Sequence, residues 1–227
     1  MLLSFRVANY RSFRDEVTFS TLATRLDKGV GRAVTVAADG STVDVLPVVA
    51  IMGANASGKS NLLRAVTYMR EAVVLSVQRA PFEAIRRDSF RLDRSYHDRP
   101  MLFEVEFSLE GSRYQYGFEI GKNEFTGEWL LTYPHKRAQT LFDRDNGEYQ
   151  FGKRLGGQHR VITEITRPNV LFLSAAAQAG HPLLSKIYEY FLHNLVLLDV
   201  PERGRVARPL IDRLQQRHRR AVQLLAL

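Results

Sequence analysis

The sequence predicts an α/β fold with an additional region of antiparallel strands, and two patterns indicate it. A short apolar run at residues 46–52 passes through a glycine-containing loop into a segment of helical periodicity at residues 60–78. Farther along, apolar and polar residues alternate in several short segments of residues 101–151, as they do in antiparallel hairpins. A strand, a loop and a helix in that order are typical of the α/β class, and the alternating segments form its second, all-β part.

The chain is expected to open with a β-hairpin. Apolar residues alternate with polar or small ones over residues 2–8, and the alternation resumes at Val17 and Phe19 after a turn at residues 9–12. Residues 28–41 are rich in Gly and Ala, so we expect a loop there and an extended stretch after it.

Residues 46–52 have the sequence Leu-Pro-Val-Val-Ala-Ile-Met, which is almost wholly apolar. Such a short run predicts a strand that is buried on both faces. After the loop, apolar side chains recur every three to four residues up to about residue 78. This spacing places them along one face of a helix, so we expect that face to be buried.

The middle of the sequence predicts an antiparallel sheet. Two alternating stretches at residues 101–109 and 112–120 flank a short turn, and further strands are expected at residues 128–133 and 140–151. The last stretch is broken by the hairpin-turn sequence Asp-Asn-Gly at residues 145–147. Because the aromatic residues of these stretches recur with the period of a strand face, we expect them to form the core rather than a surface on which bases stack.

Beyond residue 157 we expect a strand at residues 170–173 and helices at residues 182–196 and 209–227. The last helix still shows an apolar pattern at Leu227, without a polar tail or cap. We therefore expect that the natural chain continues.

The composition is that of an ordinary globular protein in a reducing compartment. The 227 residues are 45% hydrophobic and 25% charged, and the absence of cysteine excludes disulfides and thiolate metal sites. No apolar run approaches the ~18–20 residues of a membrane helix, and no signal peptide is evident, so we expect a cytoplasmic protein without a membrane partner. The six histidines are scattered singly, which predicts no metal site. The net charge of +8 favours an anionic partner, and nucleic acid is one candidate.

Residues 53–60 read Gly-Ala-Asn-Ala-Ser-Gly-Lys-Ser, a complete Walker A motif between a predicted strand and a predicted helix. The glycines let the backbone wrap around phosphate oxygens, and the loop amides point inward as donors. Lys59 is the catalytic residue of this motif and is expected to reach the β- and γ-phosphates of ATP, while the Ser60 hydroxyl is expected to bind Mg²⁺. The predicted nucleotide-binding residues of the loop are Gly53, Asn55, Ala56, Ser57, Gly58, Lys59 and Ser60.

The flanks of this loop resemble one group of P-loop ATPases. Residues 3–13 read Leu-Ser-Phe-Arg-Val-Ala-Asn-Tyr-Arg-Ser-Phe, and Asn61 follows the Walker motif. Both features are similar to the heads of the RecF, RecN and SMC family, in which an N-terminal strand ends in an Asn-Phe-(Lys/Arg)-Ser-Phe-like turn. The sequence also resembles compact AAA-type ATP-binding proteins of bacterial abortive-infection and phage-defence loci, whose middle region is similar to residues 90–93, 103–107 and 171–174.

The resemblance implies an ATP-binding head of the ABC/SMC type at residues 1–200, followed by a basic helical segment at residues 201–227 that leads to a further C-terminal part. It also implies that Arg11 and Ser12 lie beside the bound nucleotide, with a solvated turn residue as the equal alternative for Arg11. Asn61 matches a residue that helps to separate this branch from transport ATPases, where a threonine is more usual.

In function, the resemblance implies a homo-oligomer in which two protomers sandwich ATP. Nucleotide would then control an effector protein, such as a nuclease, in defence against phage. Two alternatives stay open: a DNA-repair ATPase that clamps nucleic acid directly, and an ATP-binding scaffold that acts through assembly with little turnover. Salt-dependent binding to duplex DNA separates the first alternative, and a turnover assay separates the second.

Two catalytic elements of this family have no clear counterpart in the sequence. No Ser-Gly-rich signature occurs. Asp199 follows an apolar run as the aspartate of a Walker B strand does, but Val200 stands where a glutamate is expected. We therefore favour a structural role for Asp199 and expect the Walker B strand beyond Leu227. The seven arginines between Arg203 and Arg220 favour an exposed basic helix face over a grip on nucleic-acid phosphates.

Overall fold

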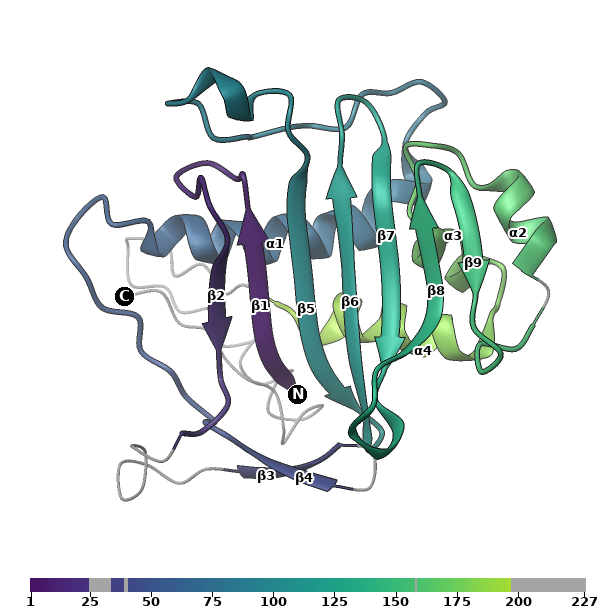
Figure 1. The fold of residues 1–227 in the computed structure, drawn as a ribbon, viewed down its shortest axis with the longest axis horizontal. Helices are drawn as coiled ribbons and strands as arrows, with labels where there is room; N and C mark the ends of the chain where they lie inside the picture. The colour runs from purple at the N-terminus through teal and green to yellow at the C-terminus, as the bar shows by residue number, and fades with distance from the viewer. Residues whose placement is uncertain (25–33, 39–40, 158, 197–227) are drawn as a thin grey trace, which may run out of the picture.

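A seven-stranded antiparallel sheet forms the centre of the structure (Figure 1). The computed structural model describes residues 1–24, 34–38, 41–157 and 159–196. The strands follow one another across the sheet in the order β2 (Val17–Ser20), β1 (Leu2–Ala8), β5 (Met101–Leu109), β6 (Ser112–Ile120), β7 (Phe125–Thr132), β8 (Gln139–Asp145) and β9 (Glu148–Phe151). The N-terminal hairpin and the hairpins predicted for residues 101–151 are therefore confirmed.

The N-terminal strand β1 lies inside this sheet, with β2 on one side and β5 on the other. Phe5 of β1 pairs with Phe19 of β2 and with Val105 of β5. Between β2 and β5 the chain leaves the sheet and forms β3 (Val34–Ala38), β4 (Ser41–Val45), α1 (Lys59–Leu75) and the 3₁₀ turns η2 (Ser76–Gln78) and η3 (Arg94–Tyr96). The chain then returns to the sheet, where β5 pairs with β1. As a result, the N-terminal turn lies close to segments that follow it by 50 or more residues in the sequence.

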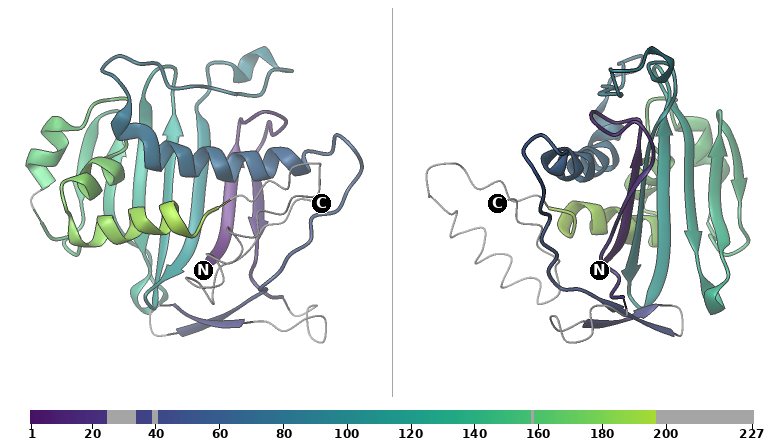
Figure 2. Two further views of the ribbon diagram at one scale, coloured as in Figure 1. Left: turned by 180° about the vertical axis from the view of Figure 1, so that it is seen from behind. Right: turned by 60° about the vertical axis from the view of Figure 1, so that its left-hand side comes forward.

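Two long helices cover one face of the sheet (Figure 2). These are α1 and α4 (Pro182–His193), and they pack against each other as well as against the strands. The shorter helices are α2 (His159–Ile165), near the β9 edge, and α3 (Phe172–Gln178), which packs against α4; η4 (Pro134–Lys136) joins β7 to β8. The predicted helices at residues 60–78 and 182–196 are confirmed, the second ending at His193.

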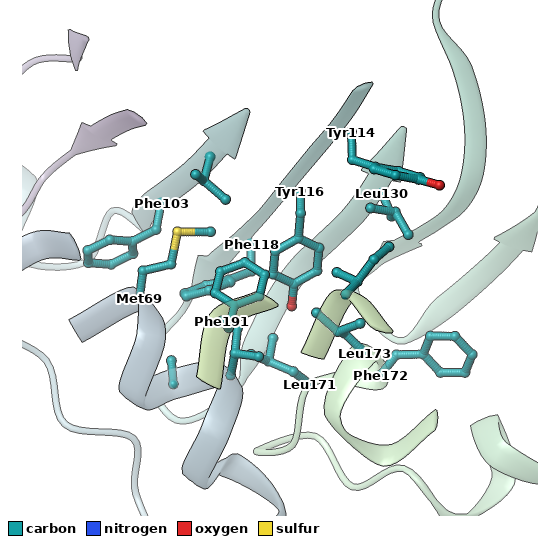
Figure 3. Packing of buried hydrophobic residues seen from close by; sticks show 14 of the residues in the cluster. Met69, Phe103, Tyr114, Tyr116, Phe118, Leu130, Leu171, Phe172, Leu173 and Phe191 are labelled. Atoms are coloured by element: carbon teal, nitrogen blue, oxygen red, sulfur yellow. The ribbon is translucent and has the colours of Figure 1, made fainter. Parts of the chain in front are cut away.

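The core lies between the sheet and these helices (Figure 3). Phe103 and Phe118 of neighbouring strands face Met69 of α1, and all three side chains are buried. Phe107 of β5 stacks on Tyr190 of α4 with 4.2 Å between ring centroids. The prediction that the aromatic residues form the core is therefore confirmed for these strands.

The strand predicted at residues 170–173 is wrong, because α3 begins at Phe172. The physical reason is Glu128 of β7, whose fully buried carboxylate accepts hydrogen bonds from the amides of Phe172 (2.6 Å) and Leu173 (2.9 Å). The Tyr116 hydroxyl donates to the same carboxylate at 3.0 Å. Burial raises the pKa of Glu128, while the Arg144 guanidinium at 3.9 Å and the two amides oppose that shift. An anion at the helix start thus outweighs the β propensity of the segment.

The buried strand predicted at residues 46–52 is also wrong. The segment is extended but belongs to no sheet, and Val48 and Met52 are 74% and 88% exposed. A strand is stabilised by its hydrogen-bonded neighbours, and within the described ranges no strand lies alongside these residues. The loop predicted at residues 28–41 is wrong for its described part, since residues 34–38 form β3 and pair with β4.

Asp199, the arginines from Arg203 to Arg220 and the segment of residues 201–227 lie outside the described residues. The two-part division of the chain at residue 200 therefore stays a prediction. Among the helices that are described, none has both the length and the apolar character required to cross a bilayer.

Candidate phosphate-binding site

The loop at residues 53–58 joins the extended segment to the start of α1 (Figure 1). Its backbone turns through left-handed conformations at Ala56 (φ 63°) and at Gly58 (φ 96°), which is the N-cap of α1. For Ala56 this conformation costs about 1–2 kcal/mol, because its Cβ approaches the following carbonyl. Strain of this kind concentrates at binding sites, where the surrounding structure maintains it.

The amides of this loop are free to bind an anion. The Ser57 amide donates to the Ala54 carbonyl at 3.2 Å. In the part of the chain that the structure describes, the following loop amides have no protein acceptor: Asn55, Ala56, Gly58, Lys59 and Ser60. The last two also belong to the first turn of α1, where the helix dipole adds partial positive charge. Together they form a concave set of donors for phosphate oxygens.

Lys59 lies across this loop. Its Nζ donates to the carbonyl oxygens of Gly53 and Ala54, both at 2.7 Å, and lies 3.5 Å from Ser57 Oγ. No carboxylate pairs with Lys59 among the described residues, so its charge is met only by neutral dipoles. A Cβ at Gly53 would lie 2.9 Å from Ser57 Oγ, so a larger residue there would require the Ser57 side chain to move. The site therefore combines a lysine that has no acidic partner, Lys59, with loop amides that have no acceptor.

The N-terminal turn contacts the start of α1. Asn61 Nδ2 donates to Ser12 Oγ at 2.8 Å, and Arg11 Nη1 lies 3.5 Å from Asn61 Oδ1. A Cβ at Gly58 would come within 3.2 Å of Ser12 Oγ and 3.3 Å of the Phe13 ring. The structure thus brings Arg11, Ser12 and Asn61 together beside the loop, while their role in nucleotide binding stays a prediction.

Asn9 is a positioning residue whose role is not predicted by the sequence. It is 3% exposed and has a φ of 50°. Its Nδ2 donates to the carbonyls of Tyr96 (2.9 Å) and Arg99 (2.8 Å), and its Oδ1 accepts from the Phe90 amide at 3.1 Å. Asn9 therefore fastens residues 90–99 to the turn that carries Arg11 and Ser12. The turn sequence contains this asparagine, but the segment that its side chain contacts is too distant in the sequence to be predicted from the turn.

A cavity of about 240 Å³ lies on the flank of α1 beside this turn. Arg11, Arg64 and Arg86 line it together with the acids Glu71 and Asp88. Asp88 accepts from Arg86 at 3.1 Å and lies 3.7 Å from Arg11 Nε. The cavity thus has one more cation than anion, which is compatible with a phosphorylated ligand on the adjacent loop.

The residues present fit a Mg²⁺ ion that arrives with a nucleotide. Ser60 is exposed at the start of α1, where its hydroxyl would contribute one ligand. Within the described ranges, no three or more His, Asp or Glu side chains gather as a metal site. A Mg²⁺ ion with few protein ligands keeps several waters and binds chiefly to phosphate oxygens, which matches such a surrounding.

Comparison with protein-family models gives one match. Residues 48–220 match the model described as AAA domain, putative AbiEii toxin, Type IV TA system. This range is most of the chain, and it begins just before the phosphate-binding loop. A search of curated proteins finds no match.

Proposed function

Because the chain belongs to the AAA-domain family described as a putative AbiEii toxin of a type IV toxin–antitoxin system, we propose that it is an ATP-driven switch. Nucleotide-dependent association of two or more copies would control an effector protein, for which a nuclease is our leading candidate. The family is one of P-loop ATPases, which bind nucleotide usually with Mg²⁺.

The observation that carries this proposal is the set of free amides around Lys59. A triphosphate would replace the carbonyl oxygens of Gly53 and Ala54 as partners of Lys59, and its negative charge would meet the first turn of α1. Ser60 would hold Mg²⁺, which supplies neutralisation of the phosphate charge when bound. Arg11, Ser12 and Asn61 would then contact the nucleotide from the side of the N-terminal turn.

The exposure of the loop supports association as the regulated step. Asn55, Ala56 and Ser57 are all exposed, so a bound γ-phosphate would face water on one side. Stabilising charge at that phosphate requires that water is excluded and that donors approach from the open side. A second protomer is the simplest source of that surface, as the resemblance to ATP-sandwich heads implies.

The two other functions remain distinguishable from this one. A DNA clamp is favoured by the net charge of +8, and it predicts duplex binding that weakens steeply with salt. A scaffold without turnover is favoured by the environment of Lys59, because in the described part of the chain no acidic residue contacts the loop to activate water. Measured turnover by the full-length protein would exclude the scaffold.

The first test removes the lysine. We expect Lys59→Ala to weaken ATP binding about ten- to hundredfold, because a hydrogen bond to a charged group contributes about 1.5–3 kcal/mol. Binding is measured by calorimetry or by fluorescence of a labelled nucleotide, and circular dichroism shows whether the fold is retained.

Lys153→Ala is the matched control, because Lys153 is an exposed lysine outside the loop. It should bind ATP as the wild type does. A folded Lys59→Ala variant with wild-type affinity would refute the assignment of the site.

The second test measures assembly. We expect light scattering of the full-length protein to show larger particles with ATP and Mg²⁺ than without nucleotide, because the γ-phosphate bridges two surfaces. Lys59→Ala should show no nucleotide response. A protein that stays monomeric at micromolar concentration while it hydrolyses ATP would contradict the composite site and indicate a self-contained enzyme.

A further inference from the structure

An exposed aromatic side chain, that of Phe82, belongs to the loop that follows α1 and η2, at the opposite end of α1 from the phosphate-binding loop. Phe82 follows η2 and is fully exposed, at 102% of its reference area. Its φ of 66° lies in the left-handed region, which is rare for a bulky residue and costs about 1–3 kcal/mol. The strained backbone costs stability, and burial of the ring does not offset this cost, so the two features together indicate a role in binding.

A cavity of about 670 Å³ lies directly beside this ring. Its walls come from three separate segments: the loop after η2, the turn between β6 and β7, and the loop before α3. We call it the Phe82 groove, and it is defined by the residues that line it: Pro81, Phe82, Glu83, Asn123, Glu124, Arg167, Pro168 and Asn169. Pro81 and Pro168 give it apolar walls.

The loop that presents Phe82 is held in place. Asn169 is 4% exposed, and its Nδ2 donates to the carbonyls of Ala80 and Glu83, both at 3.0 Å. The Ala80 amide donates to Glu83 Oε2 at 2.8 Å, which closes the same loop from within. Phe82 at the tip is therefore positioned by its neighbours, and little conformational entropy would be lost when the ring is buried by a partner.

The groove also has both signs of charge. Its charged lining residues are Arg167, Glu83 and Glu124, and the Glu83 carboxylate already accepts from the Ala80 amide. Arg167 and Glu124 belong to different walls of the groove, and neither has an ion-pair partner among the described residues. The Arg167 guanidinium donates to the Val77 carbonyl at 3.3 Å, which satisfies one of its donors and leaves its charge uncompensated. A partner that fits here must bring an apolar group, an anion for Arg167 and a cation for Glu124.

A second copy of this chain brings all three. We propose that the Phe82 groove is a two-fold interface, in which Phe82 of each copy enters the groove of the other. A two-fold contact uses the same patch on both partners, so the inserted side chain and the cavity that receives it must belong to one patch, as they do here. The same operation can set Arg167 of one copy against Glu124 of the other, which pairs these two charges across the interface.

This contact is independent of nucleotide. The phosphate-binding loop lies at the start of α1, and the 17 residues of the helix separate the two sites by about 25 Å. The two interfaces can therefore be occupied together, and two different two-fold contacts on one chain build tetramers or longer assemblies rather than dimers alone. The Phe82 contact remains testable if the proposed ATP switch is wrong.

The test is sedimentation velocity of the full-length protein without nucleotide. We expect the wild type to self-associate and Phe82→Ser to weaken that association at least tenfold. Phe82 makes no packing contact that holds the fold, because its side chain is fully exposed, so the variant should fold normally. Leu92→Ser is the matched control, since Leu92 is 91% exposed on another loop and should leave association unchanged.

A charge pair sharpens the test. Glu124→Arg should weaken association, and mixing it with an Arg167→Glu chain should restore it, because the reversed charges then face each other across the interface. A wild-type protein that is monomeric at about 100 µM without nucleotide overturns the proposal and leaves the groove to a different protein or a small ligand. Association that is unchanged in Phe82→Ser overturns it equally.

Discussion

Two helices of this protein begin in opposite surroundings. The first amides of α3, those of Phe172 and Leu173, donate to the buried carboxylate of Glu128. The first amides of α1, those of Lys59 and Ser60, have no protein acceptor within the described ranges and lie at the surface. Both helix starts have the same partial positive charge, but only α3 has its anion supplied by the chain itself.

This difference distinguishes a helix start with a structural role, that of α3, from a helix start that can bind a ligand, that of α1. A helix start whose anion is a buried side chain of the same protein is closed to ligands and anchors the helix to the sheet. A helix start whose donors stay unpaired, next to a lysine without a carboxylate, is available to an external anion. Burial decides between the two, since a buried donor without a partner costs about 1–3 kcal/mol while an exposed donor binds water.

The largest effect is expected when the internal anion is removed. Glu128→Ala leaves two amides, the Tyr116 hydroxyl and Arg144 without their buried partner, and we expect it to lower the free energy of unfolding by about 3–5 kcal/mol. Urea denaturation of wild type and variant measures the change. Glu148→Ala removes an exposed carboxylate of β9 and should change stability by less than about 0.5 kcal/mol. Equal losses in both variants would show that the Glu128 contacts contribute little.

A smaller effect is expected at the turn beside α1. Asn9→Ala removes the side-chain contacts to residues 90–99, and we expect a loss of about 2 kcal/mol relative to the control Asn146→Ala. Asn146 also has a positive φ, of 47°, so the control carries the same backbone strain without the buried hydrogen bonds. Hydrogen exchange should be faster at residues 90–99 in Asn9→Ala only. Unchanged exchange there would mean that Asn9 does not fasten this segment.

Sequence reasoning succeeded where the signal is local. The hairpins of β5–β9 follow from alternation and from the Asp-Asn-Gly turn, and α1 follows from its apolar spacing. The Walker A motif places the loop directly before α1, as the structure has it, while phosphate binding by this loop stays a prediction. These elements need no knowledge of distant residues.

Sequence reasoning failed where residues distant in the sequence determine the local structure. Residues 170–173 have strand-like side chains, but Glu128, 44 residues before Phe172, fixes a helix start there. Residues 46–52 have the composition of a buried strand, yet a strand forms only beside another strand, and no described residue supplies one. The contacts of Asn9 with residues 90–99 and the exposure of Phe82 likewise depend on the tertiary structure, which local patterns in a single sequence do not predict.

The resting position of Lys59 has a consequence for the rate of ligand capture. Because its ammonium group already spans the carbonyls of Gly53 and Ala54, the loop keeps its curvature without a ligand. An arriving phosphate would exchange two hydrogen bonds and would not need to fold the loop around itself. Capture would then be governed by diffusion and by attraction between opposite charges, so its speed, more than the final occupancy, would fall as ionic strength rises.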